Sequence, residues 1–188
     1  AILHYNNPVR SVCEIHIGVQ AGVASWSVDC ISELEKLIEH GAMGEIAVRL
    51  HLPMGGSAYN FGEKFGACPD DAVTLLQRVA RAGYQAAMTF HVGTQCIDHT
   101  AWDHYISACH DIAQLAGVTL SRLNVGGGFP AHRHGVAPDL AAIFIQIITS
   151  TERTFGDQAP ELVCEPGRAL VSECYQLLVR VKGRKANN

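Results

Sequence analysis

Three consecutive glycines, Gly126, Gly127 and Gly128, follow directly on a strand-like segment within SRLNVGGGFP, residues 121–130. Glycine has no Cβ and tolerates positive φ, so such a run lets backbone N–H groups point at an oxyanion such as phosphate. A strand that ends in a flexible turn would give the same local sequence, so the motif needs support from its neighbours. The chain must nevertheless fold so that some group comes close to this backbone.

Two other segments share this design, an apolar run with functional groups only at its C-terminal end. Residues 88–95, MTFHVGTQ, lead into His91, and residues 162–170, LVCEPGRAL, lead into Glu165. His91, Gly126 and Glu165 are 35 and 39 residues apart, which is one strand, one helix and one return per step. Parallel strands joined by helices end on one side of the sheet, where α/β proteins bind ligands. The three motifs are therefore predicted to meet at one site.

Composition indicates a globular chain and excludes several classes of protein. The 188 residues are 48% hydrophobic and 17% charged, which suits a substantial core. The formal charge of −4 argues against the positively charged surface that nucleic-acid-binding proteins need. No apolar run approaches the ~20 residues of a membrane span. The opening residues indicate a strand and a turn rather than a signal peptide. We therefore expect neither a nucleic-acid partner nor a membrane partner.

Cysteine and histidine usage points to a cytoplasmic protein without a metal site. The seven cysteines form no CxxC pair and lie mostly in apolar segments, so they are interpreted as reduced core residues. The ten histidines show no HExxH or other metal-ligand spacing.

Strand and helix patterns alternate six times, which predicts a parallel sheet with crossover helices. Strands are expected at residues 2–5, 23–28 and 46–52 and directly before His91, Gly126 and Glu165; helices are expected at 8–20, 31–39, 70–82, 100–116 and 138–155. Asp29 is the expected N-cap of the second helix. The glycine-rich segment 53–68 is expected to be a functional loop. Residues 169–181 are predicted to form one long strand that leaves the α/β layer.

Several motifs in this order resemble one family. They are YNNPVRSVCEI, SVDCISELEKL, GEKFGA, FHVGTQ, LNVGGGFP and CEPGRALV. Together they are similar to the pyridoxal-phosphate barrel of the fold-type III decarboxylases, which act on ornithine, lysine, diaminopimelate or arginine. The resemblance covers nearly the whole chain. It implies a (β/α)8 barrel followed by a β-sandwich domain, in a head-to-tail homodimer with active sites at the subunit boundary.

Against that family the chain corresponds to a partial (β/α)8 TIM-like barrel, strands three to eight, since such a barrel needs roughly 250 residues. Residues 1–168 are expected to form the alanine-racemase-like cofactor-binding barrel, and residues 169–188 a strand connecting to a missing C-terminal β domain. The lysine that forms a Schiff base with the cofactor in the family is expected upstream. None of the lysines in the chain stands in that context: Lys36, Lys64, Lys182 and Lys185.

An opened barrel also makes a structural prediction. We expect either an open six-stranded sheet with residues 2–5 on one edge and the Glu165 strand on the other, or neighbouring chain material filling the gap. Its inward-facing apolar residues should be exposed and its edges unpaired, so the segment alone should be neither stable nor active.

The resemblance assigns roles to several site residues. Glu165 matches the carboxylate that bonds the pyridine nitrogen, where a negative charge keeps that nitrogen protonated. His91 matches the histidine that stacks on the ring, and Arg168 the arginine that binds the phosphate through its planar fork. A surface acid, a core histidine and a solvated strand residue are the respective alternatives.

The remaining cofactor-binding residues follow from the same motifs. Thr94 stands where the family commonly has a phosphate-binding serine, and either hydroxyl can donate. The set expected to hold pyridoxal 5'-phosphate is His91, Thr94, Gly126, Gly127, Gly128, Glu165, Pro166, Gly167 and Arg168. His91 and Glu165 are also the candidate catalytic residues.

Two further positions are left open. Arg49 aligns with a family arginine that faces the site, but a buried structural ion pair would explain it equally well. Asn124 stands where many members have an acid, and no role is assigned to it.

For the complete protein, the resemblance implies decarboxylation of a basic amino acid to a diamine and CO2 in polyamine biosynthesis. Ornithine or lysine is favoured as substrate by the YNNP and SVDC segments. Diaminopimelate decarboxylation is one alternative. A non-catalytic decarboxylase-like regulator or pyridoxal-phosphate-binding protein is another, which an upstream lysine at the end of a strand would exclude.

Overall fold

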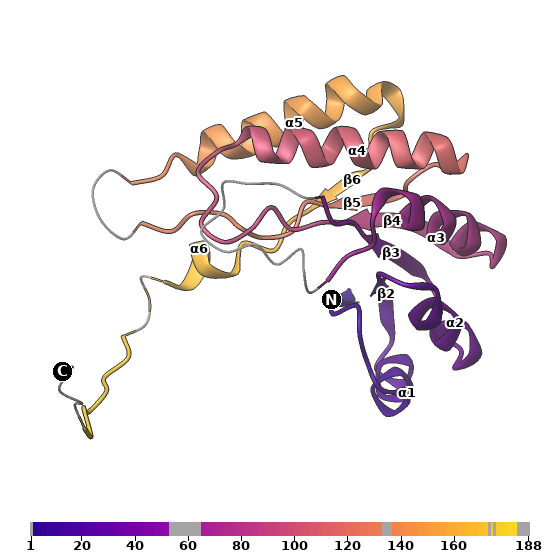
Figure 1. Cartoon of the computed structure of the whole chain (residues 1–188), viewed down its shortest axis with the longest axis horizontal. Coiled ribbons are helices and arrows are strands. Elements are labelled where there is room, and N and C mark those ends of the chain that lie inside the picture. Colours follow the sequence, from indigo (N-terminus) through magenta and orange to yellow (C-terminus); the bar gives the residue numbers. More distant parts are fainter. Residues whose placement is uncertain (1, 53–64, 133–136, 173, 175, 184–188) are drawn as a thin grey trace, which may run out of the picture.

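Six parallel strands form one open sheet in the computed structural model, which describes residues 2–52, 65–132, 137–172, 174 and 176–183 (Figure 1). The strands are β1 (Leu3–Tyr5), β2 (Val23–Val28), β3 (Glu45–Arg49), β4 (Gln85–Thr89), β5 (Arg122–Asn124) and β6 (Glu161–Val163). They lie in chain order, and each pairs in parallel with the next. The predicted open sheet with β1 and β6 at its edges is therefore confirmed.

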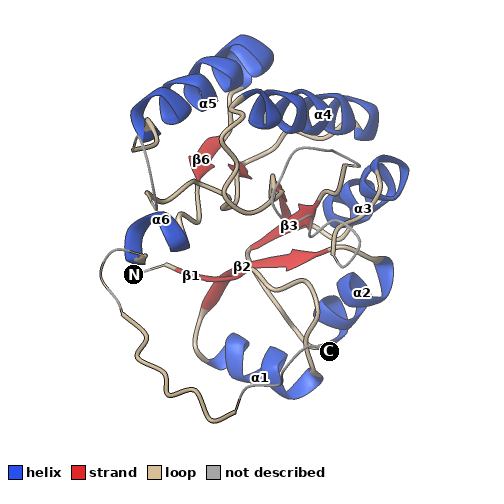
Figure 2. Ribbon diagram, turned by 60° about the vertical axis from the view of Figure 1, so that its left-hand side comes forward, coloured by secondary structure: helices blue, strands red, loops and turns tan. Residues whose placement is uncertain are grey.

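Helices follow the strands and lie around the outside of the sheet. They are α1 (Val12–Gln20), α2 (Ile31–Glu39), α3 (Pro69–Arg81), α4 (Thr100–Ala116), α5 (Leu140–Phe155), with the 3₁₀ helix η1 (Gly156–Gln158), and the short α6 (Gly167–Val171). Figure 2 shows the strands near the centre, with α1 to α5 arranged around them. Because parallel strands twist in one sense, the sheet curls into a half-barrel. This is the partial barrel that the sequence predicts.

Local sequence determines where the elements begin. β2, α2 and α4 have the predicted bounds. α1 begins at Val12 rather than at residue 8, because Ser11 and Glu14 form a capping box: the Ser11 hydroxyl accepts from the Glu14 N–H at 3.3 Å, and the Glu14 carboxylate accepts from the Ser11 N–H at 2.7 Å.

The predicted cap of α2 is wrong. Cys30 occupies the N-cap position, without a side-chain cap bond. The Asp29 carboxylate instead accepts a hydrogen bond from the Gly66 N–H at 3.0 Å. Asp29 therefore holds the end of the loop after β3 rather than the start of the helix after β2.

The predicted long strand over residues 169–181 is also wrong. Residues Gly167–Val171 form α6, and no strand follows among the described residues beyond it. Leu177 and Leu178 are 88% and 98% exposed. An apolar β-type sequence needs a neighbouring strand to form a ladder, and the described part of the chain supplies none there. Residues 53–64 of the predicted glycine-rich loop, Lys64 among them, lie outside the described residues.

The interpretation of the cysteines as core residues holds only in part. Cys96 and Cys109 are buried, Cys164 is half-buried, and the exposed ones are Cys13, Cys30, Cys68 and Cys174. All seven are free thiols. In the described residues no helix has the length and apolar character needed to cross a membrane.

The two faces of the sheet differ in character. The strand registers align large buried side chains on the helix-covered face, among them Trp26, Ile46, Val48, Met88 and Leu123. The same registers align small or polar residues on the inner face, namely Ser25, Ser27, Glu45, Ala47, Arg49, Ala87, Thr89, Arg122 and Asn124. The expectation that opening the barrel exposes inward-facing apolar residues is therefore wrong for these strands, since the core lies between sheet and helices.

A buried carboxylate organises the N-terminal end of the inner face. Glu45, 5% exposed, accepts hydrogen bonds from the Ser25 hydroxyl at 2.7 Å and the Ser121 hydroxyl at 3.0 Å. Arg122 donates to the same carboxylate at 3.2 Å and to Glu161 at 3.0 Å. This network joins β2, β3, β5 and β6 at the end away from the predicted site, where residues of barrels of this type serve stability.

Candidate functional site

The loops that follow β4, β5 and β6 converge at the C-terminal ends of the strands. The parallel hydrogen bonding continues past the strands: the Phe90 N–H donates to the Asn124 carbonyl at 3.2 Å, and the Glu165 N–H donates to the Gly126 carbonyl at 2.7 Å. Backbone and side chains of all three predicted motifs therefore come together. His91 lies two residues beyond β4, and Glu165 two residues beyond β6.

Close backbone packing explains the first and third glycines. Gly126 has a φ of +67°, and a Cβ there would lie 1.9 Å from the Phe90 carbonyl oxygen. Gly128 has a φ of +93°, and its Cβ would lie 2.3 Å from the Gly93 carbonyl oxygen. An L-residue would meet both backbone strain and a clash at either position. These glycines are required first of all for the packing of neighbouring loops.

The middle glycine lies where the motifs meet. A Cβ on Gly127 would lie 2.8 Å from the Glu165 carbonyl oxygen and 3.1 Å from His91 Nε2. A side chain at this position would fill the space between the imidazole and the loop that carries the carboxylate. The absence of a Cβ lets the Gly127 backbone lie directly against His91 and the Glu165 loop, and we call this junction the Gly127 cradle.

Asn124 is a site residue to which sequence reasoning assigned no role. It is 5% exposed, and its Nδ2 donates to Glu165 Oε1 at 2.6 Å. Its Oδ1 accepts from the Gly126 N–H at 2.9 Å. One amide thus orients the carboxylate and fixes the start of the glycine run. Since the Gly126 N–H is engaged here, it is not one of the bare donors that the sequence predicted for an oxyanion.

His91 is held as a neutral imidazole. Its Nδ1 accepts a hydrogen bond from the Gly93 N–H at 3.0 Å, which places the proton of the neutral ring on Nε2. Burial, and secondarily the positive charge of Arg49, lowers the pKa of His91 below its ordinary value. A neutral, oriented ring at the edge of the Gly127 cradle suits stacking against a flat ligand.

Arg49 belongs to the same end of the inner face. It ends β3 and pairs in register with Thr89, and its guanidinium lies 5.2 Å from the centre of the Phe65 ring. Burial lowers its pKa, while the negative charge of Glu165 opposes that shift most strongly. Its place at the C-terminal end of the inner face and its attraction to Glu165 agree with both open interpretations, a site-facing arginine and a structural ion pair.

The remaining predicted residues lie in the segments that follow β4 and β6. Thr94 is half-buried in the loop between Gly93 and Gln95. Pro166 is the N-cap of α6, and the Gly167 N–H donates to the Glu165 carbonyl at 2.8 Å. Arg168 is exposed on α6, one turn beyond the carboxylate. Within the described ranges, no group of three or more histidine, cysteine, aspartate or glutamate side chains is arranged to hold a metal ion.

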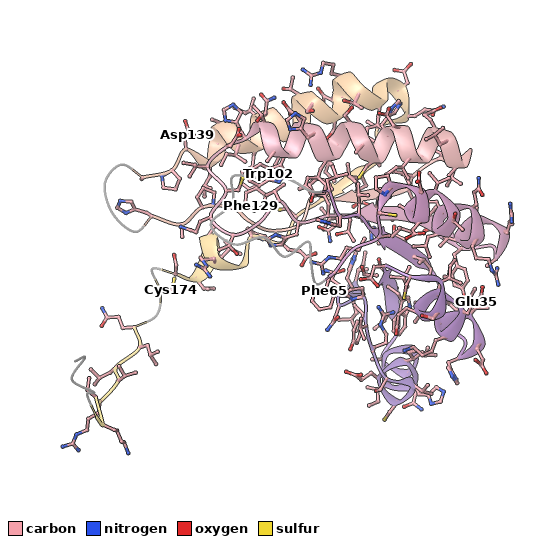
Figure 3. The ribbon with its side chains drawn as sticks, in the orientation of Figure 1. Glu35, Phe65, Trp102, Phe129, Asp139 and Cys174 are labelled. Carbon is pink, nitrogen blue, oxygen red and sulfur yellow. The ribbon has the colours of Figure 1, made fainter. Side chains whose placement is uncertain are left out.

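An aromatic anchor fixes the far end of the glycine loop. Phe129, which follows Gly128, is 2% exposed and stacks on Trp102 of α4, with ring centroids 5.2 Å apart (Figure 3). Its other neighbour is Phe144 of α5, at 4.9 Å. The loop is thus held at one end by Asn124 and at the other by helix packing.

Loops that gather a glycine cradle, an oriented carboxylate and a neutral imidazole at the carboxyl ends of parallel strands define the ligand-binding end of a (β/α)8-type barrel. Residues 2–172 match the family model described as pyridoxal-dependent decarboxylase, pyridoxal binding domain. The chain belongs to this family.

Individual relatives agree with this assignment. The chain is 30% identical to a lysine/ornithine decarboxylase of Selenomonas ruminantium over 186 residues, which cover 96% of this chain and 47% of that protein. It is 25% identical to mouse ornithine decarboxylase, with 96% and 40% covered. The crystal structure of lysine decarboxylase from Selenomonas ruminantium superposes with a TM-score of 0.75 at 30% identity, covering 88% of this chain and 44% of that one. The chain thus spans about half the length of the relatives it matches.

Proposed function

We propose that the protein carrying this chain decarboxylates a basic amino acid, ornithine or lysine, to a diamine and CO2 with pyridoxal 5'-phosphate as cofactor, as a step of polyamine biosynthesis. The relative named lysine/ornithine decarboxylase supports the substrate class. So does SrLDC, solved in complex with PLP and cadaverine, which superposes with a TM-score of 0.74 at 29% identity. The observation that carries the proposal is the Glu165 carboxylate, held by Asn124 beside the Gly127 cradle.

The residues present fit this cofactor. The Gly127 backbone lies against both His91 and the Glu165 loop, so the two groups that would contact the ring are held next to the glycine loop that would contact the phosphate. Glu165 would hold the pyridine nitrogen and His91 a face of the ring. The phosphate would be held by the Gly127 and Gly128 N–H groups, the Thr94 hydroxyl and Arg168, with Pro166 and Gly167 shaping the turn between Glu165 and Arg168.

When bound, pyridoxal phosphate supplies an electron sink for the bond that breaks at Cα. The chain's own contribution is electrostatic and positional. The Glu165 carboxylate, oriented by the 2.6 Å bond from Asn124, would hold a proton at the pyridine nitrogen. His91 carries no charge near neutral pH, because its pKa is lowered, so it adds no positive charge against the ring.

The catalytic lysine is assigned to none of the lysines in the chain. Lys36 lies on α2 and donates to the Arg10 carbonyl and to Glu33, each at 2.6 Å, so it is occupied in a structural contact. We propose that the protein acts as a homodimer in the cytoplasm. The seven free thiols, four of them exposed, support a reducing environment.

The experiment compares Glu165→Ala with Arg168→Ala in the full-length protein, with Glu152→Gln on α5 as a control outside the site. Release of diamine and CO2 from ornithine and lysine is measured alongside cofactor binding by absorbance. Glu165→Ala should lose far more turnover than cofactor affinity, because the nitrogen contact matters most as negative charge develops. Arg168→Ala should show weakened cofactor retention that excess pyridoxal phosphate restores.

Three results would contradict the proposal or one of its residue assignments. A parent protein that binds the cofactor but releases no diamine from either amino acid would favour the non-catalytic alternative. Normal turnover in Glu165→Ala would remove that carboxylate from the reaction, and cofactor retention in Arg168→Ala equal to that of the parent would remove Arg168 from the phosphate site.

A further inference from the structure

Gln95 combines an unusual backbone with an unusual side-chain contact. Among the described residues it is the non-glycine residue with positive φ, at 55°. The left-handed conformation is unfavourable for an L-residue with a long side chain, and such residues persist only where the surroundings fix them. Gln95 directly follows Thr94, a residue of the cofactor-binding set. Its conformation therefore sets the direction in which the chain leaves Thr94.

The Gln95 side chain pairs with the backbone of the glycine loop as a strand would. Its Nε2 donates to the Ala131 carbonyl at 3.1 Å, and its Oε1 accepts from the Ala131 N–H at 2.8 Å. The next residue extends this pairing, since the Cys96 N–H donates to the Gly128 carbonyl at 2.9 Å. Three hydrogen bonds thus join the loop of residues 91–96 to the loop of residues 126–131. We refer to them as the Gln95 clasp.

The amide is specific for this role. Ala131 offers one donor and one acceptor, and only a side chain with both groups in one plane matches the two at once. Glutamate keeps the acceptor but, when ionised, places an oxygen against the Ala131 carbonyl. Alanine and glycine lose both bonds. The partners are 36 residues apart in sequence, so the clasp is a tertiary contact and not part of a local turn.

We propose that Gln95 is a positioning residue for the cofactor phosphate: through the clasp it fixes the Thr94 hydroxyl relative to the N–H groups of Gly127 and Gly128. This inference rests on the proposed cofactor site and extends it. Both sets of phosphate donors lie on loops, and a shift of one loop against the other would separate them. The helix-packed Phe129 holds the glycine loop, and the clasp transfers that rigidity to the Thr94 loop.

The test uses Gln95→Ala, Gln95→Glu and Gln95→Gly in the full-length protein, with Gln114→Ala on the exposed face of α4 as control. Pyridoxal phosphate affinity is measured without substrate, by absorbance and by the phosphorus NMR line of the bound phosphate. We expect a loss of about tenfold or more in affinity for all three variants, a broadened phosphorus line, and turnover restored by saturating cofactor. Gln114→Ala should be unchanged.

Gln95→Gly separates positioning from general stability. Glycine and alanine both lose the two Ala131 hydrogen bonds, but only glycine relieves the positive φ, so cofactor-free Gln95→Gly should unfold at a higher temperature than Gln95→Ala while its cofactor affinity is equally low. Affinity within twofold of the parent in Gln95→Ala and Gln95→Gly would overturn the inference. So would a cofactor affinity that recovers in Gln95→Gly in step with its higher stability relative to Gln95→Ala. The affinity, phosphorus NMR and unfolding measurements need no decarboxylation, so they still test the role of Gln95 if the protein does not catalyse the proposed reaction.

Discussion

Replacing Gly126 by alanine separates two costs that the structure assigns to the glycine loop. Gly126 and Gly117 share a φ of +67°, but a Cβ on Gly117 meets no atom within 4 Å, whereas on Gly126 it lies 1.9 Å from the Phe90 carbonyl oxygen. Gly117→Ala should therefore show the left-handed strain alone, ~1–2 kcal/mol. Gly126→Ala adds displacement of packed backbone, ~1–3 kcal/mol, for a total of about 2–5 kcal/mol.

Urea unfolding of the cofactor-free full-length protein measures both variants. The Phe90 carbonyl precedes His91, so its displacement should also weaken cofactor binding in Gly126→Ala and leave it unchanged in Gly117→Ala. If both substitutions lowered the free energy of unfolding equally, the backbone around Gly126 would be able to move aside without an energetic penalty. The close approach would then not be the reason for glycine at position 126.

Two further predictions concern the ionisable side chains His91 and Glu45. Because the pKa of His91 is lowered in the folded protein, the stability it contributes is present above the ordinary value of 6.5 and is lost as pH falls below it. His91→Asn should therefore lose less unfolding free energy than the parent between pH ~7 and ~5, and equal losses would contradict the assigned burial. Glu45→Ala should cost about 3 kcal/mol or more by leaving Arg122 and two serines without their shared acceptor, with cofactor affinity unchanged. A loss below about 1 kcal/mol in thermal or urea unfolding would show that Glu161 and water replace the carboxylate.

Sequence alone predicted those parts of the fold whose signals are local. The β2, α2 and α4 segments carry clear periodicity and end at glycine or turn residues, so their bounds were predicted correctly. Spacing between motifs then placed His91, the glycine run and Glu165 at one end of one sheet. The strand predicted over residues 169–181 failed, because apolar β-type composition does not show whether a partner strand is present.

The residues that the sequence did not reveal act through distant partners. Asn124 contacts a carboxylate 41 residues away, and Gln95 contacts a backbone 36 residues away. Neither residue type is unusual for a loop, and no local pattern distinguishes them. Only the pairing of β5 with β6 indicates the role of Asn124. In that pairing Asn124 lies beside Val163, so its side chain comes near the residues that follow β6.

The small and polar inner face has a consequence for how this segment would associate in isolation. Sheets that expose an apolar face adhere through that face, but here the inner face carries hydroxyls, charged groups and alanine methyls, and Ser27, Ala47 and Ala87 on it are at most 5% exposed. The unpaired backbone lies instead along β1 and β6, and Leu3 is 45% exposed on the first of these. We therefore expect the isolated segment to self-associate by pairing of its edge strands, which would extend the sheet. A lysine or proline substitution in β1 or β6 should oppose this association, whereas substitutions on the inner face should not be needed.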